Sequence, residues 1–232
     1  MCREAPEQPD DTCRRCRELL AQHEDDRGLA DLLEQQHPSC QCEQHCIGVG
    51  SPGVVQDNEY VHRIIASPRD YDPVSRTIRV TPFGKVAENG LSVWRGNGPE
   101  EDIRRLLEDG LTRSASEPHR EIFAICEVEA GEIRRMRSAD DQRLFCIYDQ
   151  TVCPVNPDEP PVSTHASVFL RVLAPPGTPH GKRMQKDYAL QLREKFIAAT
   201  IAAVEYRSGL CMPLNARAAN GEFVRNGTAR RP

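Results

Sequence analysis

The chain has 232 residues, 38% of them hydrophobic and 28% charged, with 30 Lys and Arg against 35 Asp and Glu. This hydrophobic content excludes a wholly disordered chain, and the formal net charge of -5 argues against a dedicated nucleic-acid-binding protein. No apolar run approaches the roughly 20 residues that a membrane-spanning helix needs, so the sequence predicts no membrane association.

The first 46 residues form a cysteine-rich, acidic module. They hold six of the ten cysteines, and 11 Asp and Glu against five Arg. No apolar segment typical of a secretory signal precedes the module, so we expect a cytoplasmic protein in a reducing compartment. In such a compartment, clustered cysteines hold metal more often than they form disulfides. We therefore predict a metal-binding module over residues 1–47 and a glycine-rich linker at residues 48–57.

Two short cysteine-containing segments, or knuckles, define the predicted metal site: residues 13–16 and residues 37–46. Zinc takes four thiolate or imidazole ligands in a tetrahedron, and two knuckles supply two ligands each. The candidate ligands are Cys13, Cys16, His37, Cys40, Cys42 and Cys46, and the spacing leaves open which four bind. A catalytic zinc would need an open position beside a carboxylate such as Glu43, whereas the surplus of cysteines favours a closed structural site. An iron–sulfur cluster and a redox-active CxxC pair are the alternatives.

Hydrophobic patterns predict the helices and strands in chain order. In the module, leucines at helical spacing indicate a helix over residues 16–36, with Gly28 as an interruption. In the body, the patterns predict strands at 60–65, 77–81 and 90–95, a helix at 99–109, strands at 121–128, 143–148 and 166–173, and a long helix at 182–206. This order favours an α+β domain over residues 58–215, with a mixed or antiparallel sheet, and a flexible tail at 216–232.

The long helix at 182–206 carries a wide apolar stripe. Tyr188, Leu192 and Phe196 lie on one side of it, and charged residues occupy the other side. Such a stripe packs on the protein's own sheet more often than on a second copy. We therefore expect Leu192 and Phe196 to lie in the core.

The body offers few side chains that suggest chemistry. Cys126 and Cys146 lie inside predicted strands, and we interpret them as small buried side chains. Cys153 lies in a proline-rich loop, where it is a candidate reactive thiol. His165 lies at the mouth of a predicted strand and is a candidate general base, with a buried, hydrogen-bonded histidine as the alternative.

Residues 92–111 read SVWRGNGPEEDIRRLLEDGL, a strand that ends in Arg-Gly before a helix that closes with Gly-Leu. This pattern resembles the opening strand and helix of ADP-ribosyltransferase-like proteins. The resemblance implies that Arg95 binds the phosphates or ribose of NAD and takes part in catalysis. It also implies that Gly96 admits the nucleotide close to the backbone. Residues 60–63 (YVHR) also fit the opening strand of such proteins, and only one of the two segments can be that strand.

These features lead to three expected functions. The first is a zinc-binding protein with a binding or regulatory role, since an acidic surface with exposed leucines suits a basic protein partner. The second is an NAD-consuming, ADP-ribosyltransferase-like enzyme or toxin. The third is a nucleic-acid-binding zinc protein, which is disfavoured because the acidic module repels phosphate and aromatics for base stacking are few. The sequence leaves open whether the chain is an enzyme and what its oligomeric state is.

Overall fold

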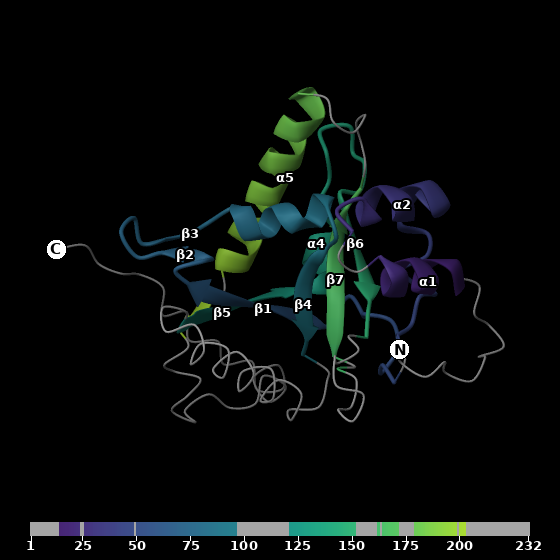
Figure 1. Cartoon of the computed structure of the whole chain (residues 1–232), viewed down its shortest axis with the longest axis horizontal. Coiled ribbons are helices and arrows are strands. Elements are labelled where there is room, and N and C mark those ends of the chain that lie inside the picture. Colours follow the sequence, from purple (N-terminus) through teal and green to yellow (C-terminus); the bar gives the residue numbers. More distant parts are fainter. Residues whose placement is uncertain are drawn as a thin grey trace.

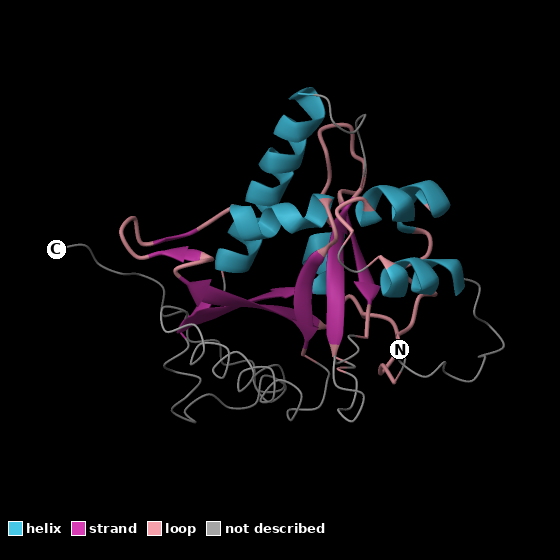
Figure 2. Cartoon of the chain, viewed as in Figure 1, coloured by secondary structure: helices cyan, strands magenta, loops and turns pink. Residues whose placement is uncertain are grey.

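The computed structural model describes residues 14–23, 26–48, 50–96, 121–151, 162, 164–171, 179–198 and 200–202. Figure 1 labels the helices and strands along the chain, and Figure 2 distinguishes helices, strands and loops by colour. The predicted helix at 99–109, Cys13, Cys153 and the predicted tail at 216–232 lie outside the described residues.

Six strands form one antiparallel sheet in the order β6-β7-β4-β1-β5-β8. They are β1 (Tyr60–Ser67), β4 (Leu91–Arg95), β5 (Glu121–Glu129), β6 (Phe145–Asp149), β7 (His165–Leu170) and β8 (Thr200–Ala202). Two short strands, β2 (Tyr71–Asp72) and β3 (Thr77–Ile78), pair separately with each other. The strands form where β-branched and aromatic residues cluster. The antiparallel sheet and its long helix confirm the predicted α+β class.

The helices are α1 (Arg14–Gln22), α2 (Leu29–Gln36), α4 (Ala130–Arg134) and α5 (Pro179–Ile197), with the 3-10 helices η1 (Pro38–Cys40) and η2 (Thr81–Ala87). The helix expected at 16–36 is therefore two helices, and the interruption expected at Gly28 lies directly before α2. Asp26 accepts a hydrogen bond from the Gly28 N–H at 2.8 Å, and this turn separates α1 from α2. The strand expected at 77–81 ends at Ile78, because Pro82 suits the first turn of η2 better than a strand.

The helix predicted at 182–206 is wrong at its C-terminal end. α5 ends at Ile197, and Thr200–Ala202 form β8, which pairs with residues 124–126 of β5. Threonine and isoleucine are β-branched and favour strands, and a sheet partner decides between the two structures here. Neither α5 nor any other helix in the described part of the chain is long and apolar enough to cross a membrane.

The main hydrophobic core lies between the sheet and α5. Alternate strand residues point into it, such as Leu91 and Val93 of β4. Leu192 and Phe196 of α5 are fully buried there, and the Phe196 ring lies 5.7 Å from the Phe83 ring of η2, centroid to centroid. The apolar stripe of the long helix therefore packs on the protein's own sheet, as the sequence predicts.

The N-terminal module packs against the other side of β6 and β7. Phe145 and Ile147 of β6 belong to the main core, whereas Cys146 and Tyr148 contact a second cluster that contains the leucines of α1 and α2. This division follows from the two-residue period of a strand. Figure 1 shows α1 and α2, in purple, beside β6 and β7. The module is thus held against one end of the sheet.

Candidate metal centre

Cys16, His37 and Cys42 form the candidate metal site. Cys16 lies on α1, His37 caps the C-terminus of α2, and Cys42 follows η1. One ligand atom of each residue lies within 4.8 Å of the ligand atoms of the other two. Thiolate sulfur and imidazole nitrogen are ligand types that zinc prefers. The three residues can therefore hold a metal ion when both sulfurs are thiolates.

A tight turn after α2 brings these residues together. Ser39 and Cys40 adopt left-handed backbone conformations, with φ of 65° and 60°, and the chain reverses there. Apolar packing keeps α1 beside α2 at the same time. The buried leucines that do so are Leu19, Leu20, Leu29 and Leu33. Cys42 consequently returns to the side of α1 that carries Cys16.

Burial controls the chemistry of Cys16. Its side chain is fully buried, and this burial raises the pKa of the thiol to about 11. The thiol is therefore protonated at neutral pH and is a weak nucleophile. A metal ion favours the thiolate, so binding at this site would displace the proton. Cys16 is thus poorly suited to act as a reactive cysteine, and a metal ion would have to displace its proton in order to bind.

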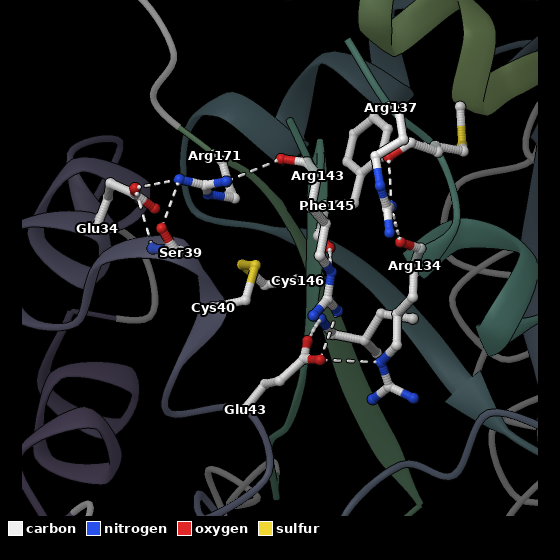
Figure 3. The surroundings of a disulfide bond; sticks show 12 residues. Glu34, Ser39, Cys40, Glu43, Arg134, Arg137, Arg143, Phe145, Cys146 and Arg171 are labelled. Atoms are coloured by element: carbon white, nitrogen blue, oxygen red, sulfur yellow. Dashed lines mark hydrogen bonds and ion pairs between the residues drawn. A yellow bond between two sulfur atoms is a disulfide. The ribbon is translucent and has the colours of Figure 1, made fainter. Parts of the chain in front are cut away.

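Two of the predicted metal ligands are disulfide-bonded. Cys40 of η1 is bonded to Cys146 of β6, 106 residues away, with their Cα atoms 5.4 Å apart (Figure 3). Cys42 is disulfide-bonded too. The expectation that the clustered cysteines avoid disulfides is therefore wrong for Cys40 and Cys42. For Cys40 the reason is that the fold places it beside a cysteine of a distant strand. Neither Cys40 nor Cys42 offers a thiolate in this oxidation state.

The remaining described cysteines are buried thiols. Cys46 belongs to the same buried cluster as Cys16 and Cys42, which makes it a candidate fourth ligand. Cys126 of β5 lies in the main core, which confirms its interpretation as a small buried side chain. Cys146 is also buried, but its disulfide corrects the same interpretation there.

Glu43 anchors the module to the sheet domain through two arginines (Figure 3). Its fully buried carboxylate accepts hydrogen bonds from Nε of Arg134 at 3.0 Å, from the guanidinium of Arg143, and from the Ile147 N–H at 2.7 Å. Arg134 also donates to the carboxylate of Asp57 at 2.6 Å. Glu43 is therefore engaged by cations and cannot serve as the base of a catalytic zinc. Sequence reasoning missed both arginines, which lie 91 and 100 residues from Glu43.

Arg171, directly after β7, makes a second polar connection beside the disulfide (Figure 3). It donates to the carboxylate of Glu34 at 3.2 Å, to the hydroxyl of Ser39 at 2.9 Å, and to the Arg143 carbonyl at 3.2 Å. Together with Glu43, this arginine fixes the turn that carries Cys40. The module therefore has polar as well as covalent and apolar attachments to β6 and β7.

Arg95 is buried among protein acceptors. Only 2% of its side chain is exposed, and it donates to both carboxylate oxygens of Glu59, at 2.7 and 2.9 Å, and to Asp149 at 2.6 Å. A Cβ atom on Gly96 would lie 3.0 Å from the Tyr60 carbonyl oxygen and from the His62 ring, so a side chain there would require these neighbours to shift. These contacts give Arg95 and Gly96 structural roles. The NAD-binding role that the resemblance implies stays a prediction.

His165, the other candidate catalytic residue, is a buried histidine with a hydrogen-bond partner. Its Nδ1 lies 2.9 Å from the Gln150 carbonyl oxygen, which accepts, so Nδ1 carries the proton. The ring meets that of Trp94 edge-on at 6.0 Å. Burial lowers the pKa of His165 to about 4, so the ring is neutral at pH 7. His165 is therefore the buried, hydrogen-bonded histidine that the sequence analysis gives as the alternative to a general base, and its low pKa makes it a weak base.

The low pKa of His165 predicts a loss of stability in mild acid. The unfolded chain protonates this residue near its ordinary pKa of 6.5, whereas the folded chain does so only near pH 4. Between these values the unfolded state binds more protons, so stability falls as the pH falls, by about 1.4 kcal/mol per pH unit. Urea unfolding at several pH values measures this slope.

His165→Gln should flatten the stability slope, because the amide still donates to Gln150 but does not titrate. His23→Gln, directly after α1, is the control for a histidine-to-glutamine change at a half-exposed position. Equal slopes for the parent and His165→Gln would contradict the assignment.

No family model, curated protein or solved structure matches this chain. The fold and the site by themselves define an α+β protein in which a cysteine-rich module is fastened to one end of an antiparallel sheet. In that module the ligand atoms of Cys16, His37 and Cys42 lie close enough together to hold a metal ion, and Cys40 and Cys42 are disulfide-bonded.

Proposed function

We propose that this chain is a zinc-binding protein with a binding or regulatory role through a protein partner. The observation that carries the proposal is the convergence of Cys16, His37 and Cys42. Ligand atoms around a tetrahedral zinc lie about 3.5–3.8 Å apart. The ligand atoms here lie within 4.8 Å of one another, so binding needs a contraction of about 1.3 Å at most. The mixed sulfur and nitrogen ligands favour zinc over an iron–sulfur cluster, which usually takes four thiolates.

The fourth ligand is another cysteine in this proposal. Cys46 and Cys13 are the two candidates, because Cys46 shares the buried cluster and Cys13 stands three residues before Cys16 in the CxxC pair. Four protein ligands close the site to substrate, and Glu43 is engaged by arginines instead of facing an open position. The site is therefore structural, which favours a binding role over catalysis.

The charge of the module indicates the type of partner. Its first 46 residues carry 11 acidic side chains against five arginines. Such a surface attracts a basic protein and repels nucleic-acid phosphate. The zinc would hold α1, α2 and the following turn in one arrangement, so that this surface has a defined shape.

Metal analysis tests the proposal. We expect about one equivalent of zinc per chain after purification under reducing, anaerobic conditions, because binding needs the Cys42 thiolate. Cys16→Ser and His37→Ala should each lower the content well below that of the parent. Cys126→Ser is the matched control, since this buried cysteine lies in β5 within the main core, and it should keep the full content.

Two outcomes would contradict the zinc function. One is a parent protein with less than about half an equivalent of metal under these conditions. The other is a Cys16→Ser variant that retains as much metal as Cys126→Ser.

A further inference from the structure

Cys42 belongs to two arrangements that exclude each other. Its sulfur is one of the three clustered ligand atoms of the candidate metal site. The same sulfur is disulfide-bonded in the structure. A disulfide sulfur has no thiolate charge to give to zinc, so only one of the two arrangements can exist at a time.

Cys16 is a thiol in the disulfide-containing structure. It is buried beside the cluster and is free of any disulfide, as expected of a ligand whose metal has lost its other sulfur. The structure therefore shows this candidate site with Cys42 oxidised and Cys16 reduced.

We propose that disulfide formation at Cys42 releases the metal, so that the redox conditions control whether the centre is loaded. This inference rests on the zinc-binding function proposed above. The co-reactant is a small-molecule disulfide of the glutathione type. The consequence is a regulated site, in which the reduced protein holds zinc and the oxidised protein holds a disulfide at Cys42 instead.

The reaction is two successive thiol–disulfide exchanges. A metal-bound protein thiolate attacks the small disulfide, forms a mixed disulfide and expels one small thiolate. A second protein thiolate then attacks the mixed disulfide, forms the protein disulfide and expels the second small thiolate. Two protein sulfurs are oxidised, the two sulfurs of the small disulfide are reduced, and the zinc ion leaves with its charge unchanged.

The Cys40–Cys146 disulfide keeps the module in place when the metal leaves. It joins η1 to β6 covalently. Glu43 with Arg134 and Arg143 holds the following turn without any metal or sulfur contact. Oxidation is therefore expected to empty the centre while the module stays docked on the sheet.

The test uses the full chain, reduced and loaded with zinc under anaerobic conditions, with glutathione disulfide as the oxidant. A chromogenic chelator follows zinc release, while alkylation and mass spectrometry report the state of each cysteine. We expect about one zinc ion to be released for each Cys42 that enters a disulfide. Cys16 should remain alkylatable after unfolding, and dithiothreitol with added zinc should restore loading.

Cys146→Ser separates the two described disulfides. It removes the partner of Cys40 but leaves Cys16, His37 and Cys42 unchanged, so the oxidant should still release zinc with the same stoichiometry. Cys40→Ser tests the same point from the other side of the bond if Cys146→Ser does not fold.

The outcomes distinguish this inference from the function on which it rests. Zinc that stays bound after Cys42 is fully disulfide-bonded overturns the inference. Zinc that is released while Cys42 remains a free thiol, as alkylation would show, overturns it too. Loss of oxidant-driven release in both serine variants overturns it as well. All three leave the zinc-binding function standing, whereas a reduced chain that takes up no zinc overturns both.

Discussion

Replacing Arg95 with methionine is expected to lower the free energy of unfolding by about 3–5 kcal/mol. Arg95 bonds to Glu59 and Asp149, whose side chains are 0% exposed. Methionine replaces the apolar stem of arginine but leaves both carboxylates buried without a cation. Urea unfolding of parent and variant measures the difference.

Arg79→Met is the matched control for Arg95→Met. Arg79 is exposed, so its replacement should change stability by no more than about 0.5 kcal/mol. Adding Glu59→Gln and Asp149→Asn to Arg95→Met should recover part of the loss, since neutral amides need no buried cation. A loss below about 1 kcal/mol for Arg95→Met would show that the buried ion pairs do not support the fold.

The Arg95 prediction also affects how the NAD alternative is tested. An Arg95 variant that loses turnover does not show NAD binding, because loss of the fold has the same result. Nicotinamide release from NAD by the parent protein is the direct measurement. Turnover by the parent would support the enzyme alternative.

Phe196→Ala is expected to cost about 3–5 kcal/mol of stability, and Leu192→Ala about 2–5 kcal/mol. Both side chains are 0% exposed in the core beneath α5, and the Phe196 ring packs on Phe83. Each truncation removes buried apolar surface and leaves a cavity. Against a total stability of roughly 5–15 kcal/mol, either change should shift the thermal midpoint by many degrees.

Leu190→Ala is the matched control on the same helix. Its side chain is 41% exposed, so the substitution should alter stability much less than Leu192→Ala. Thermal melting at several protein concentrations adds a second check, because a dimer helix would give a concentration-dependent midpoint. Midpoints within a degree or two of the parent for both core variants would be incompatible with this core.

The described strands largely follow the sequence patterns, whereas element ends depend on partners. Expected strands at 60–65, 90–95, 121–128, 143–148 and 166–173 correspond to β1, β4, β5, β6 and β7. The end of α5 could not be predicted, because residues 200–202 form a strand only beside β5. In contrast, Gly28 was a local signal for the break in 16–36, and the turn that it forms with Asp26 lies directly before α2.

The candidate site was only partly predictable. The cysteine and histidine spacing indicated a metal site, and three of the six proposed ligands do converge. Nothing in the spacing pointed to Cys146 as the partner of Cys40. Asp149 carried a weak signal, since a lone carboxylate ends the apolar run of β6, but its partner Arg95 lies 54 residues away.

The sequence by itself determined the α+β class, most of the described strands, the buried stripe of α5 and the knuckles of the module. These depend on residue spacing along the chain, which backbone geometry turns into faces of helices and strands. Only the tertiary structure decided that Cys40 meets Cys146, that Glu43 meets Arg134 and Arg143, and that Arg95 is buried between two carboxylates. Those pairings depend on strand order and on where the module docks, because contacts between distant residues are set by the packing of whole elements and leave no local pattern.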